Sequence, residues 1–222
     1  MDREFQQAIH LDPDYATAHH WYALYLSAMN RMPEAINEIE KALEIDPLSN
    51  VINSNAGAIY YQAGDVEKSR KQLLRTLELD ADFIPAHGYL GYVYQTTGKY
   101  EDALAEYKKV RQISGNPLAY AGDLGRIYAL TGRKPEALGI LRQLKSESKR
   151  QSDASGFTLC LIYDSVGDSD EAFKWLKKSI ESREFTATEL SHDLRISALR
   201  NDPRFVEIQH QFNIPNPSPQ EN

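Results

Sequence analysis

The sequence predicts an all-α fold made of five copies of a helix–turn–helix unit, with half a unit before the first copy and a capping helix after the last. Two observations lead to this fold class. Residues that end helices recur every 34 or 35 positions, and small and large apolar residues recur at fixed distances from them. Self-similarity of that period is typical of helical repeat proteins, in which each unit buries its apolar face against its neighbours.

Composition and charge narrow the function classes. The chain has 222 residues, 41% hydrophobic and 26% charged, which is ordinary for a globular protein. Its net charge of −7 argues against a nucleic-acid-binding surface, which needs clustered lysine and arginine. No apolar run reaches the ~18 residues of a membrane helix, and we expect no signal peptide. We therefore expect a cytoplasmic protein, or alternatively the extracytoplasmic part of a membrane-anchored parent.

Each first helix is expected to end at a residue with a left-handed backbone conformation. Gly64, Gly98, Gly132 and Gly167 each precede a polar residue, at spacings of 34, 34 and 35. Asn30 occupies the position 34 residues before Gly64. Asparagine is the residue other than glycine that best tolerates positive φ, so one kind of turn explains all five positions.

Apolar residues around each of these turns predict two helices that pack closely. Four and seven positions before each turn lie a large and a small residue: Leu26/Ala23, Tyr60/Gly57, Tyr94/Gly91, Tyr128/Gly125 and Tyr163/Cys160. Five and nine positions after it lie another small and another large residue: Ala35/Ile39, Ser69/Leu73, Ala103/Tyr107, Ala137/Leu141 and Ala172/Leu176. Spacings of three and four place each set on one helix face. The small residues allow close approach, and the large ones fill the seam.

These landmarks set the expected boundaries. The five repeats are expected at 16–49, 50–83, 84–117, 118–152 and 153–186. Residues 1–15 read as the second helix of a truncated repeat, because Phe5, Ala8 and Ile9 have the spacing of an inward face. We therefore expect a fragment of a longer polypeptide; the alternative is a native half-unit that acts as a cap.

The C-terminal region is expected to close the array. Asp202 is a favourable N-cap, and Pro203 fits the first turn of a helix. Phe205, Ile208 and Phe212 then share one face, so residues 187–214 should cover the seam of the last repeat. Residues 215–222 are proline-rich and polar, and we expect them to be disordered.

The repeat resembles the tetratricopeptide repeat (TPR), and the resemblance covers residues 16–186. It implies a right-handed superhelix, an α–α solenoid, whose first helices line a concave groove. Its expected function is protein–protein interaction without catalysis, with a peptide or protein partner and no cofactor. Two departures are visible: Ala81 replaces a proline, and residues KSESKRQSD replace the end of the fourth unit, where we expect an extended second helix and a loop.

A narrower resemblance concerns the segments 16–49, 162–176 and 199–205. They look like the C-terminal TPR region of bacterial multidomain signalling proteins, in which the array follows a winged-helix domain, a Ser/Thr kinase or a nucleotide cyclase. The resemblance implies that this chain belongs to a larger signalling or regulatory protein. The segment 185–196 departs from that pattern.

The family resemblance also indicates which side chains would contact a partner. The expected groove positions are Thr17, His20, Leu24, Ser27, Ser54, Asn55, Ala58, Tyr61, Gln62, Gly88, Tyr92, Gln95, Thr96, Gly122, Asp123 and Arg126. Tyrosine suits recognition because it offers a large contact area with a polar tip. Arg126 could hold a carboxylate. The alternative function is self-association, with the array as a homodimerising module or a spacer for an attached output domain.

Other reactive residue types have structural interpretations. Histidines His19 and His87 share one repeat position without a metal-ligand spacing, so we expect packing or surface roles. Cys160 occupies a small-residue position and is expected to be a buried spacer. Carboxylates such as Glu34, Glu38 and Glu44 are expected on solvated outer faces of second helices. The basic run of Arg142, Lys145, Lys149 and Arg150 lies near a helix end, where it would favour the helix dipole.

Overall fold

The computed structural model describes residues 1–148, 156–184 and 196–214. The described residues form helices and turns and contain no strand. The chain divides into two compact units, Met1–Ala119 and Tyr120–Asn222. We call them unit 1 and unit 2 and describe each by itself.

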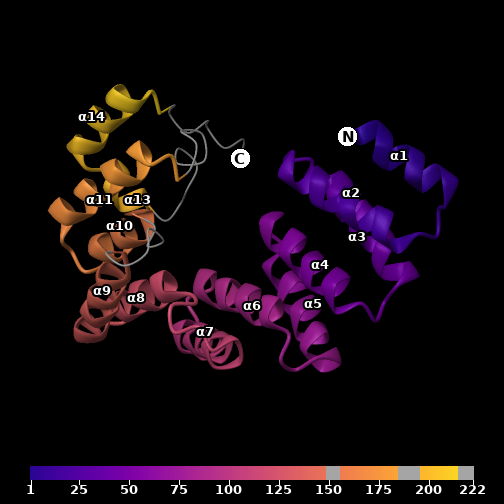
Figure 1. Ribbon diagram of the computed structural model, residues 1–222, viewed down its shortest axis with the longest axis horizontal. Coiled ribbons are helices and arrows are strands. Elements are labelled where there is room, and N and C mark those ends of the chain that lie inside the picture. Colours follow the sequence, from indigo (N-terminus) through magenta and orange to yellow (C-terminus); the bar gives the residue numbers. More distant parts are fainter. Residues whose placement is uncertain (149–155, 185–195, 215–222) are drawn as a thin grey trace. The chain divides into compact units, whose positions relative to one another are not determined.

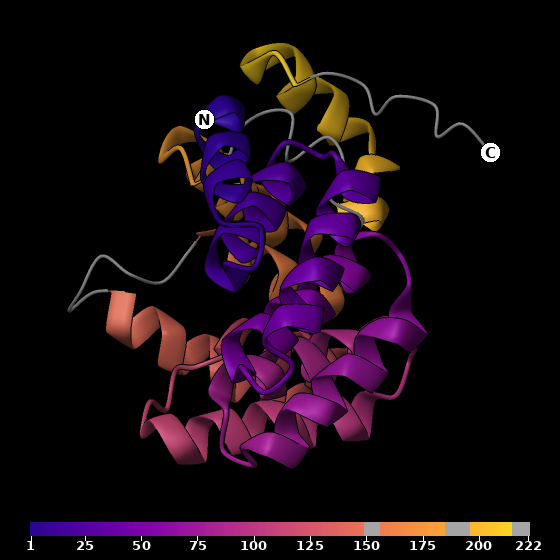
Figure 2. The same cartoon turned by 90° about the vertical axis from the view of Figure 1, so that its right-hand side faces the viewer.

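Unit 1 consists of a single helix followed by three helix pairs (Figure 1). Its helices are α1 (Asp2–Leu11), α2 (Ala16–Ala28), α3 (Met32–Ile45), α4 (Asn50–Gln62), α5 (Val66–Leu79), α6 (Ile84–Thr96) and α7 (Tyr100–Ser114). Helices α2 and α3, α4 and α5, and α6 and α7 pack as pairs. Helix α3 also contacts α4, and α5 contacts α6. Both views show the pairs of this unit following one another in chain order (Figures 1 and 2).

The turns inside the pairs have the predicted left-handed residues. The φ values are 58° at Asn30, 84° at Gly64, 73° at Gly98, 75° at Gly132 and 83° at Gly167. In each turn the residue after this one donates its N–H to a carbonyl in the last turn of the first helix, as from Asp65 to Tyr60 at 2.9 Å. The prediction from glycine and asparagine spacing is therefore confirmed at all five positions.

Small residues let the paired helices approach until side chain meets backbone. A Cβ added to Gly57 would lie 2.6 Å from the side chain of Leu73, and one added to Gly91 would lie 2.1 Å from the Tyr107 ring. Leu73 and Tyr107 are both fully buried. Cys160 is also fully buried, which confirms its expected position among the spacers.

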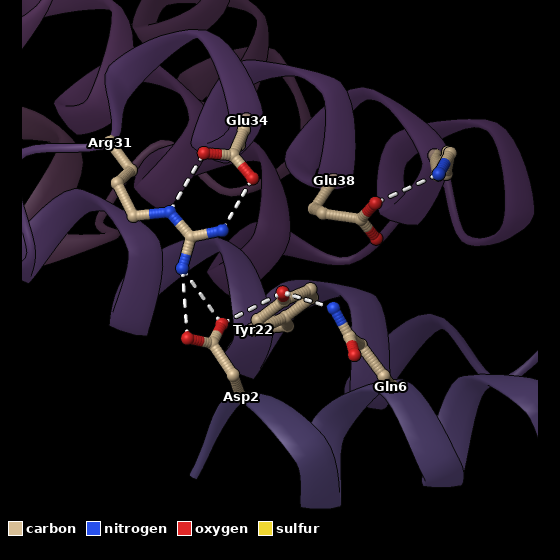
Figure 3. Close-up of polar contacts among 7 residues, drawn as sticks. Asp2, Gln6, Tyr22, Arg31, Glu34 and Glu38 are labelled. Atoms are coloured by element: carbon tan, nitrogen blue, oxygen red, sulfur yellow. Dashed lines mark hydrogen bonds and ion pairs between the residues drawn. The ribbon is translucent and has the colours of Figure 1, made fainter.

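Helix α1 packs on the first pair through its predicted apolar face. Phe5 and Ile9 contact the core around Tyr22, and the Phe5 and Tyr22 rings stack with centroids 5.4 Å apart. The N-terminal turn is also held by charge. Asp2 accepts two hydrogen bonds from Arg31 at 2.9 Å and one from the Tyr22 hydroxyl at 2.9 Å (Figure 3). These contacts fix the rotation of α1 against α2 and α3.

Unit 2 contains two further pairs and a terminal helix. Its helices are α8 (Ala121–Leu130), α9 (Lys134–Ser148), α10 (Gly156–Ser165), α11 (Ser169–Glu181), α13 (Ser197–Arg200) and α14 (Pro203–Phe212). Asp202 caps α14 by accepting the N–H of Arg204 at 3.0 Å, and Pro203 is the first helical residue, as predicted. Phe205 and Ile208 are buried, and α14 contacts α11. This terminal helix therefore covers apolar surface of the last pair.

Three predictions concern residues outside those that the structure describes. They are the loop after α9 within 149–155, most of the segment 185–196, and the proline-rich tail 215–222. Helix α9 itself extends to Ser148, within the segment expected to lengthen that second helix.

Candidate functional site

The first helices of unit 1 present a set of side chains that are polar or aromatic, apart from Leu24. We call this set the first-helix face, and it consists of Thr17, Trp21, Leu24, Ser27, Asn55, Tyr61, Gln62, Tyr89, Tyr92, Gln95 and Thr96. They come from α2, α4 and α6, which follow one another through the three pairs. All of these side chains are exposed or half-buried.

Neighbouring first helices are joined by side-chain hydrogen bonds on this face. Ser27 donates to the Gln62 side-chain oxygen, and the Tyr61 hydroxyl lies 2.8 Å from the Thr96 hydroxyl. Both bonds join residues 35 positions apart. The bonds orient the exposed amide and hydroxyl groups before any ligand arrives, which lowers the entropic cost of binding one.

Tyrosine rings gather at the α4–α6 end of the face. Tyr61 and Tyr92 stack with centroids 6.4 Å apart, and Tyr89 and Tyr107 each meet Tyr92 edge to face at 6.3 and 6.0 Å. The Tyr107 hydroxyl donates to Gln95 from below at 3.1 Å. The result is a rigid aromatic surface with polar tips, which is a common composition of protein recognition sites.

Four predicted contact residues of unit 1 lie beneath the surface: His20, Ser54, Ala58 and Gly88. His20 is 5% exposed and Ser54 is 1% exposed. The Asn55 amide nitrogen lies 2.7 Å from His20 Nε2 and donates to it. Burial lowers the pKa of His20, which favours the neutral ring that this hydrogen bond requires. The structure thus places His20 as a support for Asn55, and the binding roles of His20 and Ser54 stay predictions.

The remaining predicted residues, Gly122, Asp123 and Arg126, belong to α8 in unit 2. Arg126 carries the positive charge among them. It is half-buried and lies close enough to Asp164 of α10 to favour the ionised form of that carboxylate. Burial of Asp164 outweighs this attraction and raises the pKa of its carboxyl. Arg126 therefore shares its surroundings with a carboxylate that sequence analysis had not paired with it.

Trp21 is a residue of the face that the predicted set lacks. It is 56% exposed, and its ring lies 5.4 Å from the ring of His20. Trp21 and Tyr89 hold the same repeat position as Asn55, 34 residues before and after it. Extending the Asn55 assignment to the neighbouring repeats would have identified both residues.

A buried polar pair recurs at the start of each first helix in unit 1. His19 Nδ1 lies 2.6 Å from Glu38, and His19 Nε2 donates to the Pro13 carbonyl at 2.9 Å. His87 repeats this arrangement with Glu106 at 2.5 Å and with the Ala81 carbonyl at 3.0 Å. Each histidine thus joins the loop before its first helix to the second helix of the same repeat.

The middle repeat has a neutral version of the same pair. Asn53 donates to the Pro47 carbonyl at 3.0 Å and accepts from Gln72 at 2.5 Å. The positions match those of the histidine and glutamate in the flanking repeats, 34 residues away. We call the three pairs the polar clamps. The expectation of packing roles for His19 and His87 is confirmed, because both are buried within this arrangement.

The expectation that Glu38 faces solvent is wrong. Glu38 is 8% exposed and is held by His19 and by Lys41, whose ammonium lies 2.8 Å away. The carboxylate turns inward because a buried imidazole without an acceptor would leave a polar nitrogen unsatisfied. Glu34 and Glu44 are exposed as expected, although Glu34 binds Arg31 (Figure 3).

The described residues contain no group of three or more histidine, cysteine, aspartate and glutamate side chains able to hold a metal ion. Among the same residues, no helix combines the length and apolar character needed to cross a membrane. The arrangement on the first-helix face offers amide and hydroxyl groups that can both donate and accept hydrogen bonds. Such groups match the alternating donors and acceptors of a peptide backbone.

Comparison with protein families assigns these repeats. Residues 16–47 and 55–117 each match a family model described as tetratricopeptide repeat. These ranges include the first-helix face and the helix pairs that carry it, except for the first turn of α4. Tetratricopeptide repeats are thus confirmed in this chain. No curated protein sequence matches it.

Solved structures of TPR proteins are similar to this fold. YrrB, titled a TPR protein with an unusual peptide-binding site, is 20% identical with a TM-score of 0.57, covering 90% of this chain and 100% of its own. TTC0263, a thermophilic TPR protein of Thermus thermophilus, is 19% identical with a TM-score of 0.63, covering 75% and 90%. The Cut9–Hcn1 structure of the APC/C is 16% identical with a TM-score of 0.68, covering 89% and 38%. At such identities the likeness concerns the fold, and it confirms the predicted all-α solenoid class.

Proposed function

We propose that this protein is a non-catalytic interaction scaffold that holds a peptide or a segment of a protein partner on the first-helix face. The observation that carries the proposal is the row of oriented polar and aromatic side chains across α2, α4 and α6. Ser27 is already hydrogen-bonded to Gln62, and Tyr61 to Thr96. All four residues are exposed or half-buried, so a ligand can reach them. TPR proteins generally serve as scaffolds, which supports the same function.

The face also predicts the character of the ligand. Its side chains are neutral, and four of them are aromatic: Trp21, Tyr61, Tyr89 and Tyr92. A neutral aromatic surface favours an extended segment with apolar or aromatic side chains whose backbone amides bond to Gln62 and Thr96. Acidic C-terminal peptides of chaperones need a set of lysines that this face lacks.

The test is capture from a lysate of the source organism with wild-type protein and with the Tyr61→Ala/Tyr92→Ala variant. We expect a partner retained by the wild type and lost by the variant, because truncating central aromatic residues commonly costs more than about 1 kcal/mol each. Tyr100→Ala is the control, since Tyr100 is a half-buried tyrosine at the start of the second helix α7. Calorimetry with the captured partner then measures the affinity change. A partner held equally by wild type and by the Tyr61/Tyr92 variant would exclude this face.

Self-association is the second candidate, and one observation favours it. Helix α1 has no buried residue. Its last residue, Leu11, is 76% exposed, and Tyr15 in the turn after it is 52% exposed. A second copy could cover this apolar surface and form a homodimer. Sedimentation velocity of wild type and Leu11→Ser/Tyr15→Ser over a wide concentration range tests it. A monomer at every concentration would exclude this candidate.

The biological setting is part of the proposal. The resemblance of segments 16–49, 162–176 and 199–205 to bacterial signalling proteins supports a role in a larger regulatory protein, with the array recruiting a partner for an attached domain. The cytoplasmic location expected from the sequence belongs to the same proposal. Arg126, on α8 of unit 2, is a separate candidate for binding a carboxylate of the partner. The Arg126→Glu variant would weaken capture of a partner that carries such a carboxylate.

A further inference from the structure

A cavity of about 620 Å³ lies against helix α9 of unit 2, which is the second helix of its pair. Its floor is Leu138, Leu141 and the buried ring of Tyr163 from α10. Leu138 is 39% exposed, although it lies on the same side of α9 as the fully packed Leu141. The cavity thus exposes apolar surface that the helices of this unit leave uncovered.

Three cations border this apolar floor. Lys134, Arg142 and Lys145 all line the cavity, and no carboxylate of the described residues does. Two other cavities in the described part of the chain differ because glutamates line both. Glu67 and Glu78 offset the cations Arg70, Lys71 and Arg75 in one, and Glu34 and Glu38 line the other. In a chain with a net charge of −7, positive charge that no lining carboxylate offsets favours an acidic ligand in the α9 cavity.

The cations differ in how far they are neutralised. Lys145 has Glu171 at 3.6 Å and lies 4.8 Å from the centre of the Tyr163 ring. Lys134 donates to the Val166 carbonyl at 3.2 Å, which leaves its charge without a counter-ion in the parts of the chain that the structure describes. Arg142 is exposed and has neither an ion pair nor a hydrogen bond among the described residues. Lys134 and Arg142 are therefore the cations available to a ligand.

Spacing along α9 defines the ligand further. Lys134, Leu138 and Arg142 recur every four residues and so share one helix face. At 1.5 Å per residue, the two cations are about 12 Å apart along the helix, with the leucine midway. An extended peptide rises about 3.3 Å per residue and presents every second side chain on one side. It would match this face with an acidic residue, an apolar residue two positions later and a second acidic residue two positions after that.

We propose that the α9 cavity is a second docking site, which binds an extended acidic peptide segment with an apolar residue between two carboxylates. The apolar side chain enters the cavity over Leu138 and Tyr163, and the carboxylates pair with Lys134 and Arg142. The site uses a second helix of another unit and is independent of the first-helix face.

Nuclear magnetic resonance titration of the full chain tests this proposal. The probe is the peptide Ser-Asp-Ser-Leu-Ser-Asp-Ser, and the comparison peptide has the same composition with the two aspartates adjacent. We expect the probe peptide to shift amide resonances along α9 and at Tyr163. The comparison peptide should bind at least fivefold more weakly. Added salt should weaken binding of the probe peptide. The Arg142→Glu variant should lose at least tenfold in affinity for the probe.

Lys177→Glu is the matched control, because Lys177 is exposed on α11, outside the cavity lining, and the substitution changes charge by the same amount. Leu138→Ala should weaken binding of the probe peptide while leaving the far-ultraviolet circular dichroism of the protein unchanged. If Lys177→Glu weakened binding of the probe peptide as much as Arg142→Glu does, the proposal would be overturned, since the attraction would be nonspecific. Shifts confined to α2, α4 and α6, or a concentration-dependent mass lost in Arg142→Glu, would also overturn it in favour of the first-helix face or of a second copy.

Discussion

The polar clamps show how one repeat position can hold different residues while performing one structural role. His19, Asn53 and His87 each donate to a carbonyl six residues earlier and each face a polar side chain nineteen residues later. The shared requirement is geometric: a planar side chain with one donor toward the loop and a second polar atom toward the second helix. Histidine and asparagine both meet it, provided that the partner changes with them.

The clamps therefore predict compensation between positions. Glu38→Leu leaves the Nδ1 atom of buried His19 without a partner, and we expect a loss of about 1–3 kcal/mol in the free energy of unfolding. The double variant His19→Asn/Glu38→Gln copies the Asn53–Gln72 pair and should stay within about 1 kcal/mol of wild type. Urea denaturation measures all three proteins. A Glu38→Leu protein as stable as wild type would show that the clamp contributes nothing to stability.

His20 should make the free energy of unfolding depend on pH. Its pKa lies below the ordinary value of 6.5, so the unfolded chain takes up this proton at a higher pH than the folded chain. Stability should therefore fall as pH decreases below about 6.5 and level off below the folded pKa, by at most about 1.4 kcal/mol per pH unit. The variant His20→Asn should flatten this part of the profile, measured by urea unfolding at several pH values. His10→Asn, at an exposed histidine, is the control, and an unchanged slope in His20→Asn would refute the assignment.

Helices α6 and α9 show that glycine has opposite consequences at two mid-helix positions. Gly91 in α6 faces the ring of Tyr107, and any added Cβ would overlap it. Gly139 in α9 has nothing within 4 Å of the position that a Cβ would take. Close approach requires the first glycine, whereas the second only adds backbone entropy to the unfolded chain.

Substitution by alanine should consequently change stability in opposite directions. Gly91→Ala should lower the free energy of unfolding by about 1–3 kcal/mol through overpacking, and Gly139→Ala should raise it by about 0.5–1 kcal/mol. The double variant Gly91→Ala/Tyr107→Ile recreates the Ala23–Ile39 pair of the first repeat and should recover part of the loss. Chemical denaturation followed by circular dichroism compares the free energies of unfolding of these three variants with that of the wild type. A loss from Gly139→Ala would contradict the open environment of that residue.

Unit 1 should fold by itself, because its three helix pairs and α1 share a continuous set of contacts. Repeat proteins gain stability from each repeat and each interface between neighbours, and about three repeats are needed for a stable array. We therefore expect a fragment of residues 1–119 to be helical and to unfold cooperatively in urea. If the first-helix face is the binding site, this fragment also retains partner binding. It loses only what Arg126 contributes, because Arg126 lies outside the fragment. A fragment without cooperative unfolding would show that unit 1 depends on unit 2.

The repeat and its turns were predictable from sequence because they rest on local rules. Glycine or asparagine at φ of 58° to 84° ends each first helix, and a small residue at fixed spacing identifies each close contact. The inward turn of Glu38 was not predictable in the same way, because helix periodicity leaves a glutamate at the edge of the apolar face without assigning its partner. The equivalence of Asn53 with His19 and His87 became visible only from hydrogen bonds. Exposure of Trp21 and burial of His20 likewise depend on how consecutive first helices pack.

The hydrogen bonds between first helices join residues 35 positions apart, one more than the 34-residue period of the early repeats. In these three bonds, the polar group of one repeat is therefore bonded to a side chain at the following position of the next repeat. A substitution of Gln62 that changes specificity must be compatible with Ser27, and a substitution of Tyr61 must be compatible with Thr96. Adaptation of this surface to a new partner would therefore proceed by paired changes in adjacent repeats, and duplicating a single repeat would carry only half of each pair.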